Sequence, residues 1–256
     1  MAFQPIVDVS RRRVFAYEAL VRGAAQESAL EMLARVTEES IYAFDQSCRA
    51  KAIELASELG IAEQGALLSV NFMPGAVYSP AACIQQTLRA AQANDFPLSS
   101  LMFEITEMEE VRETARLQAI ASEYRRHGLT LALDDFGAGY SGLNLLADLD
   151  VNVLKLDGRL IRSIDRQPRA EEIVRSTAAM CRRLGVQVVG ECVETRAEYE
   201  VLRDCGINLM QGYLFARPSF ESLPKINWPE DRISRHSITS IDLGAHDHGR
   251  SLSSVA

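Results

Sequence analysis

Residues 2–20, AFQPIVDVSRRRVFAYEAL, contain two extended apolar segments, at 2–8 and 14–20. Only the five residues from Val9 to Arg13 separate them. A crossover between two parallel strands needs a dozen or more residues, so this pair is predicted to form an antiparallel hairpin. The rest of the chain follows a different pattern, because helical segments separate most of its later strands.

Six further strand candidates follow the hairpin. The strands are expected at 67–72, 101–105, 129–134, 152–157, 186–190 and 207–210, and the helices at about 28–39, 41–60, 80–94, 109–127, 169–184 and 196–205. Most of the strands are β-branched or apolar on both faces, as buried parallel strands are. Eight strands interleaved with helices predict an α/β fold, a TIM-like (β/α)₈ barrel whose first strand is antiparallel to the others. An open doubly wound sheet is the alternative.

The sequence also indicates where the predicted helices and the predicted barrel end. Glycines follow four of the predicted helices, where left-handed C-caps are expected: Gly60, Gly128, Gly185 and Gly206. The alternating pattern stops after Leu223, and the stretch from Ser234 is rich in Ser, His and Asp. We therefore expect a barrel over residues 1–223 and a flexible C-terminal extension over 224–256.

Composition excludes several classes of protein. The chain has 256 residues, of which 47% are hydrophobic, so a disordered or low-complexity chain is excluded. A net charge of −8 argues against a protein that coats DNA or RNA. No apolar run approaches the roughly 18 residues of a membrane span, and the N-terminus does not have the charge order of a secretory signal. We expect no membrane contact from this segment.

The cysteine and histidine content indicates the redox environment of the protein and the kind of metal that it could bind. The five cysteines are odd in number and lack any CxxC pair, which favours free thiols and a cytoplasmic location. Three of the four histidines lie near the C-terminus. A metal site in the body of the chain must therefore use oxygen ligands, which favours Mg²⁺ or Mn²⁺ over zinc.

Polar side chains recur at or near the ends of the apolar strands. They are Glu18, Asn71, Glu104, Asp134, Asp135, Lys155, Glu191 and Gln211. In a barrel they would converge on the C-terminal mouth, where barrel enzymes keep their active sites. Any one of these residues could simply be a solvated strand end or a member of a structural ion pair. That interpretation is improbable when the pattern recurs in seven consecutive strands. Five carboxylates, two amides and an amine are the composition of a two-metal site for phosphoryl chemistry.

These residues also carry a family resemblance that covers about residues 3–220. Glu18-Ala19-Leu20 followed by Val21-Arg22 resembles the signature of the EAL-domain cyclic-di-GMP (c-di-GMP) phosphodiesterases. The other motifs follow in order: QPI from Gln4, SVNF with Asn71, EITE from Glu104 to Glu107, DDFGAGYS from Asp134, KLD from Lys155, ECVET from Glu191 and QGY from Gln211.

The resemblance implies an enzyme that hydrolyses c-di-GMP to linear pGpG with two metal ions. Glu18, Asn71, Glu104, Asp134, Asp135 and Glu191 would ligate two Mg²⁺ or Mn²⁺ ions, with Asp134 bridging them. Lys155 would position the attacking water or share in proton transfer, and Gln211 would orient the site. The substrate would contact Gln4, Leu20, Arg22 and Glu194. Glu107 would anchor a loop. The resemblance also implies a homodimer and a sensory domain, fused or separate.

Two alternatives and one departure remain. A non-catalytic EAL receptor that binds c-di-GMP and relays a signal is the second functional hypothesis; an assay of hydrolysis separates it from the enzyme. Gly137, Gly139 and Gly142 form a GxGxxG pattern, but the two preceding aspartates would repel a pyrophosphate. Cys192 stands where the family usually has glycine, directly after a predicted ligand, and could shift Glu191.

Overall fold

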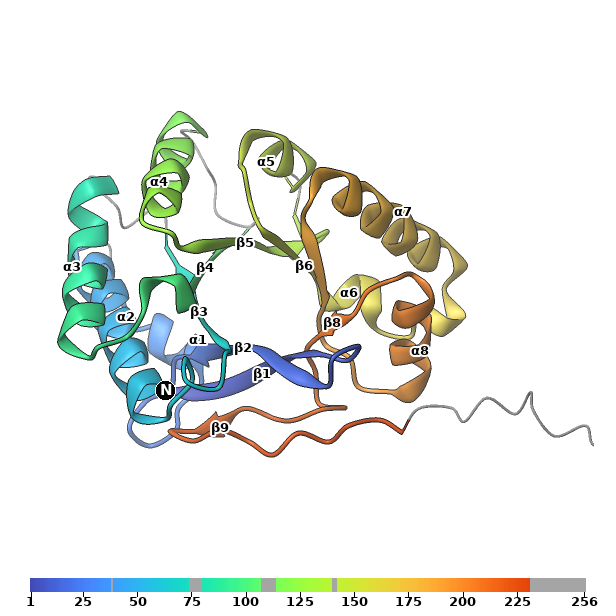
Figure 1. Ribbon diagram of the computed structural model, residues 1–256, viewed down its shortest axis with the longest axis horizontal. Coiled ribbons are helices and arrows are strands. Elements are labelled where there is room, and N and C mark those ends of the chain that lie inside the picture. Colours follow the sequence, from blue (N-terminus) through green and yellow to red (C-terminus); the bar gives the residue numbers. More distant parts are fainter. Residues whose placement is uncertain (38, 74–79, 107–113, 140–141, 231–256) are drawn as a thin grey trace, which may run out of the picture.

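The computed structural model describes residues 1–37, 39–73, 80–106, 114–139 and 142–230. Eight strands form a closed ring, seen end-on in Figure 1. They are β1 (Ala2–Asp8), β2 (Arg13–Leu20), β3 (Leu67–Phe72), β4 (Leu101–Thr106), β5 (Thr130–Phe136), β6 (Val153–Leu156), β7 (Gln187–Gly190) and β8 (Leu209–Met210). The short strand β9 (Ser219–Phe220), which was not predicted, pairs with the first residues of β1.

The direction of β1 confirms the hairpin prediction. β1 pairs antiparallel with β2, from Ala2 opposite Leu20 to Asp8 opposite Arg13. It also pairs antiparallel with β8 and so closes the ring, whereas β2 to β8 pair with their neighbours in parallel. The predicted barrel with an antiparallel first strand is confirmed, and the open sheet is excluded because it would leave β1 and β8 apart.

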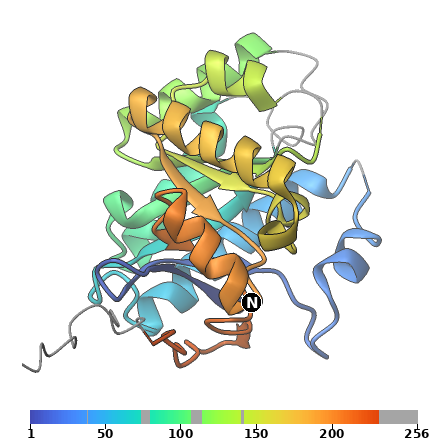
Figure 2. The same ribbon diagram turned by 90° about the vertical axis from the view of Figure 1, so that its right-hand side faces the viewer.

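Helices surround the ring, as the side view in Figure 2 also shows. They are α1 (Ala29–Leu33), α2 (Ile41–Glu58), α3 (Pro80–Ala93), α4 (Thr114–Arg126), α5 (Gly142–Asp148), α6 (Gly158–Ile161), α7 (Pro168–Leu184) and α8 (Arg196–Asp204). α1 is shorter than predicted. α5 and α6 were not predicted because one or two turns carry little periodicity. The four glycines predicted to follow helices all have φ between 64° and 82°, which confirms them as left-handed positions.

The buried side of α2 includes two charged residues. Asp45 and Arg49 are buried and form an ion pair one helical turn apart. The Arg49 guanidinium lies 4.8 Å from the ring centre of Phe72 and 5.2 Å from that of Phe103, and it donates to the Tyr124 hydroxyl. Asp45 accepts a hydrogen bond from the backbone N–H of residue 73, just after β3. The pair thus ties α2 to the end of a barrel strand.

An apolar layer fills the barrel interior at the end where the parallel strands β2 to β8 begin. It consists of Ile6, Ala16, Met102, Ala132, Val153, Val189 and Leu209, one from each strand except β3. A second, larger core lies between the strands and the surrounding helices. Successive side chains of a strand point to opposite faces, so the next inward-facing position is two residues away. What occupies those positions determines the chemistry of the barrel mouth.

The chain continues past the barrel against its outer surface. Ile226 and Trp228 pack on the core, and the backbone N–H of Asn227 donates to the carbonyl of Phe215. Residues 231–256 lie outside the described part, so the boundary at 223 and the flexible extension stay predictions. Among the described residues, no helix is both long and apolar enough to span a membrane.

Candidate active site

A polar layer lies directly above the apolar layer of the barrel, two residues further along each parallel strand. Ala16 is followed by Glu18, Met102 by Glu104, Ala132 by Asp134, Val153 by Lys155, Val189 by Glu191 and Leu209 by Gln211. In β1, which runs the other way, Gln4 comes two residues before Ile6 and stands opposite Glu18. The alternation of the strands therefore delivers one polar group after another to the same mouth.

Lys155 is the centre of this layer. Its Nζ lies 2.7 Å from Glu191 Oε1, 2.8 Å from Glu104 Oε2, 3.1 Å from Asp134 Oδ1 and 3.5 Å from Glu18 Oε2. The side chains of Lys155 and Glu104 are 1% and 0% exposed. Charges this deeply buried persist only when they are paired, so the four carboxylates and the ammonium form one electrostatic unit.

Hydrogen bonds fix the remaining atoms of these carboxylates. Gln211 Nε2 donates to Glu18 Oε2 at 2.8 Å, and Asn71 Nδ2 donates to Glu18 Oε1 at 3.1 Å. Ser69 Oγ donates to Glu104 Oε1 at 2.5 Å. Sequence reasoning missed Ser69, although it shares a strand face with Asn71 two residues later. The structure thus brings together the predicted residues of five strands, β2 to β6, with Glu191 just after β7 and Gln211 just after β8.

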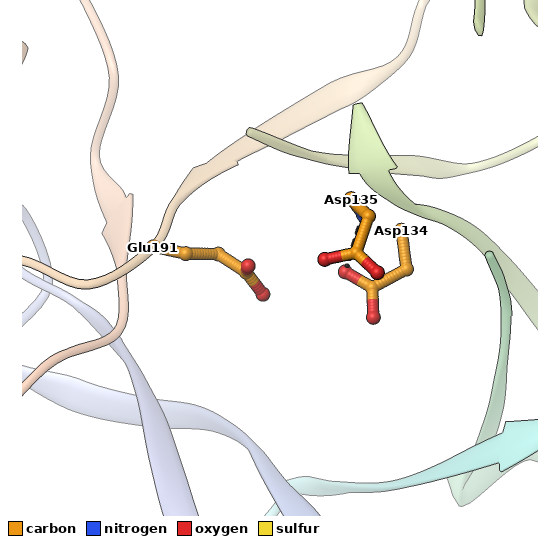
Figure 3. Close-up of side chains that lie close together, drawn as sticks. All are labelled: Asp134, Asp135 and Glu191. Atoms are coloured by element: carbon orange, nitrogen blue, oxygen red, sulfur yellow. Dashed lines mark hydrogen bonds between the residues drawn. The ribbon is translucent and has the colours of Figure 1, made fainter. Parts of the chain in front are cut away.

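Asp134 and Asp135 both reach the mouth although they are consecutive in one strand. The register between β5 and β6 shifts between Leu133 and Phe136, and Asp135 has a φ of 56°. Such a bulge re-aims a side chain that would otherwise face away from the barrel interior. Figure 3 shows Asp134, Asp135 and Glu191 pointing toward one another, and their carboxylate oxygens lie within 4.8 Å. These hard oxygen donors fit Mg²⁺ or Mn²⁺.

Burial and mutual repulsion alter the acid–base properties of the cluster. Burial raises the pKa of Glu191 to about 8 and that of Asp135 to about 6, and the Asp134 carboxylate adds to both shifts. Burial, together with Glu18, also raises the pKa of Glu104. Burial alone would lower the pKa of Lys155, but the surrounding carboxylates, Asp134 first, raise it well above its usual value. Without metal at neutral pH, Lys155 is therefore charged and the Glu191 carboxyl largely retains its proton.

The raised pKa of Glu191 predicts that the metal-free protein loses stability as pH rises. Between an unfolded value near 4.5 and a folded value of about 8, the folded state holds more protons than the unfolded state, so stability falls through this window. Lys155 does not contribute there, because both of its pKa values lie above it. We expect the melting temperature in EDTA to fall by roughly 5 °C from pH 5 to pH 8, and Mn²⁺ to reduce this fall by binding the deprotonated carboxylates.

The control for this prediction is a pair of matched substitutions. Glu191→Gln removes one titrating group and should make the profile in EDTA less steep, although Asp135 and Glu104, whose pKa values are also raised, still titrate. Glu63→Gln, at an exposed position, should leave the slope unchanged. A Glu191→Gln profile as steep as that of the unaltered protein would contradict the prediction. Melting curves at matched ionic strength provide the measurement.

The other predicted site residues divide between two cavities. Gln4 and Glu194 line a cavity of about 370 Å³ together with the carboxylates. Leu20 lines a neighbouring, mostly apolar cavity of about 380 Å³ that also includes Asn71. Arg22 lines neither of these two, and its guanidinium donates to the carbonyl of Val21 at 2.7 Å. Glu107 lies outside the described residues. The roles assigned to these five residues stay predictions.

Cys192 is held in a conformation that favours glycine. Its φ is 54°, in the left-handed region. A Cβ placed on Gly158, which opens α6, would lie 2.7 Å from the Cys192 Sγ and 2.8 Å from its Cβ. Gly158 therefore provides the space that the Cys192 side chain occupies. Gly212 serves a similar purpose opposite Val193, because a Cβ there would lie 2.1 Å from the Val193 carbonyl oxygen.

The fit between Gly158 and Cys192 predicts a compensating pair of substitutions. Gly158→Ala should displace Cys192 and, with it, the adjacent Glu191, lowering any metal-dependent turnover by about tenfold or more. Adding Cys192→Gly should restore turnover, because it removes the clashing atoms and the cost of a positive φ. Kinetics of the two single variants and the double variant give the measurement. Equal turnover in Gly158→Ala and its double variant would show that the contact does not affect Glu191.

The family model described as "EAL domain" matches residues 1–218. This chain belongs to the EAL domain family. An EAL domain accounts for most of the described residues, and the predicted family is confirmed.

Solved structures of EAL proteins resemble this chain closely. A standalone EAL protein from Vibrio cholerae O395, solved with c-di-GMP bound, is 47% identical with a TM-score of 0.85, covering 89% of this chain and 94% of that one. A manganese and c-di-GMP complex of Klebsiella pneumoniae BlrP1 is 35% identical with a TM-score of 0.84, covering 90% of this chain and 58% of that one.

Two curated relatives connect the EAL domain to different functions. The Escherichia coli blue light- and temperature-regulated antirepressor BluF is 28% identical over 90% of this chain and 57% of its own length. The Pseudomonas aeruginosa c-di-GMP phosphodiesterase RocR is 39% identical over 48% of this chain and 31% of its own length. The chain therefore spans less than two thirds of each of these relatives.

Proposed function

We propose that this EAL domain is a Mg²⁺- or Mn²⁺-dependent phosphodiesterase that hydrolyses c-di-GMP to linear pGpG. The observation that carries the proposal is the charge of the mouth. Glu18, Glu104, Asp134, Asp135 and Glu191 are five potential negative charges around one Lys155 ammonium, which leaves a formal charge of −4 when all are ionised. Two divalent cations would neutralise that charge.

The residues fit a pair of hard metal ions. The donors would be the five carboxylates and the side-chain oxygen of Asn71, whose Nδ2 already donates to Glu18. Bound divalent ions would polarise the scissile phosphate and lower the pKa of a nearby water. Gln211 would hold Glu18 in its orientation through the 2.8 Å hydrogen bond. Asp134 would bridge the two ions.

Lys155 would act as a fixed cation and hydrogen-bond donor. Without metal, the surrounding carboxylates raise its pKa well above the usual value, so the ammonium is protonated at neutral pH. Its N–H groups can orient the attacking water and stabilise negative charge that develops on the phosphate. Hydrolysis adds one water across one P–O bond, which leaves a 5′-phosphate and a free 3′-hydroxyl on the linear product.

The same proposal covers the substrate contacts and the partners. Gln4 and Glu194, which line the cavity, would contact the dinucleotide, as would Leu20, which lines the neighbouring cavity, and Arg22. A homodimer and a fused or separate sensory domain are proposed from the family. The described cysteines Cys48, Cys181, Cys192 and Cys205 are free, which supports a reducing, cytoplasmic setting.

The test is hydrolysis of c-di-GMP by the purified chain, with products separated by chromatography. We expect pGpG with Mn²⁺ or Mg²⁺, none with EDTA, and little with Ca²⁺, whose longer bonds and looser geometry would misplace the water. If the chain binds c-di-GMP but does not hydrolyse it in Mn²⁺, in Mg²⁺ or in Ca²⁺, the receptor alternative would be supported instead. That alternative is favoured by the likeness to BluF, which is named an antirepressor.

A further inference from the structure

The active-site cavity contains one cation that the proposed chemistry does not use. Its lining includes five carboxylates and two basic residues, Lys155 and Arg162. Lys155 is enclosed and is shared among four carboxylates. Arg162, by contrast, is an exposed residue at the end of α6, on the rim of the cavity. Sequence reasoning did not select it, because nothing in its motif context marks it.

The Arg162 guanidinium is uncommitted within the described part of the chain. Its Nη2 lies 3.9 Å from the Sγ of Cys192, a weak contact, and no carboxylate of a described residue lies within ion-pair distance of it. It lies over Gly158, because a Cβ on that residue would come 3.7 Å from the Arg162 Cζ. The guanidinium thus lies over the start of α6, beside the cavity.

The backbone that carries Arg162 is firmly held. Its N–H donates to the carbonyl of Gly158, and its carbonyl accepts from Gln167 Nε2, both at 2.8 Å. The next residue, Ser163, donates its N–H to Glu198 Oε1 at 2.8 Å. The other oxygen of Glu198 accepts the backbone N–H groups of Glu194 and Thr195 at 2.9 Å each. Glu198 therefore joins the Arg162 segment to the loop that carries Glu194 on the same cavity.

We propose that Arg162 is a substrate-binding residue that pairs with the second phosphate of the cyclic dinucleotide, the one that is not hydrolysed. This inference rests on the proposed function, which places one phosphate at the carboxylate cluster. The substrate carries two phosphates, and the metal ions can neutralise only the phosphate that they contact. The second phosphate needs a cation on the rim, and a guanidinium is well suited to bind it with two hydrogen bonds. Arg22 does not line this cavity, whereas Arg162 does.

The first experiment measures binding without turnover, by calorimetric titration of c-di-GMP in Ca²⁺. We expect Arg162→Gln to raise the dissociation constant by about tenfold, the effect of losing one charged hydrogen bond. Arg162→Lys should restore part of the affinity. Arg166→Gln is the matched control, since its side chain is 85% exposed and pairs with Asp165. Equal affinity in Arg162→Gln and Arg166→Gln would overturn the inference alone. No binding by the unaltered protein would overturn the proposed function and the inference with it.

The second experiment asks whether the contact is with the second phosphate. Bis(4-nitrophenyl) phosphate has one phosphodiester and no second phosphate. We expect Arg162→Gln to raise KM for c-di-GMP more than it lowers kcat. The value of kcat/KM for c-di-GMP, divided by that for bis(4-nitrophenyl) phosphate, should fall by about tenfold. An unchanged ratio would show that Arg162 acts on the reacting phosphate or on the fold, and would overturn the inference.

Discussion

A Lys155→Met variant should lose c-di-GMP turnover by about 10³-fold or more, because it removes the ammonium that would stabilise charge on the reacting phosphate. Methionine keeps most of the length of the side chain but has no charge and no N–H donor. Lys155 Nζ lies within 3.5 Å of four carboxylates, so the change also leaves those carboxylates to repel one another. Steady-state kinetics in saturating Mn²⁺ provide the measurement.

Stability and turnover are separated by two comparisons. Lys51→Met removes a cation from an exposed ion pair with Glu54, far from the carboxylate cluster in the fold, and should leave kcat unchanged. A melting curve of Lys155→Met in Mn²⁺ shows whether the variant is folded during the assay. Turnover within tenfold of the unaltered protein would mean that the metal ions alone carry the charge stabilisation and that Lys155 only holds the carboxylates apart.

An Asp134→Asn variant should lose both metal affinity and turnover. Asp134 is the residue proposed to bridge the ions, and one of its oxygens already holds the N–H of Asp135 and lies near Lys155. The substitution keeps the shape of the side chain but removes one negative charge and one oxygen donor. Substituting a residue that merely supports a metal ligand costs 10- to 100-fold in affinity, so losing a bridging ligand should cost at least about 100-fold.

The readout is turnover as a function of Mn²⁺ concentration. Asp134→Asn should shift the midpoint to much higher metal and leave low activity at saturation. Asp148→Asn, at the exposed end of α5, serves as the control and should shift neither. An unchanged midpoint with reduced turnover would place Asp134 at the substrate rather than at the metal ions.

The sequence alone predicted the barrel and most of its mouth, and the pairing of β1 with β8 in the structure excluded the open sheet. The five residues between the first two strands left no room for a crossover, so β1 had to run antiparallel. The position of each polar residue at its strand end placed Glu18, Glu104, Asp134, Lys155 and Gln211 together, because the period of a strand is fixed by the backbone. These are local rules, and they hold wherever a strand forms.

Only the tertiary structure decided the remaining features, because each depends on contacts between segments far apart in the chain. The bulge that turns Asp135 into the mouth arises in the pairing of β5 with β6. The burial of Asp45 and Arg49 depends on aromatic rings from β3 and β4, so the helical periodicity of α2 could not indicate it. Arg162 meets Cys192, 30 residues away, only because α6 and the loop after β7 lie side by side in the barrel. A pattern within one segment carries no information on which distant segment will pack against it.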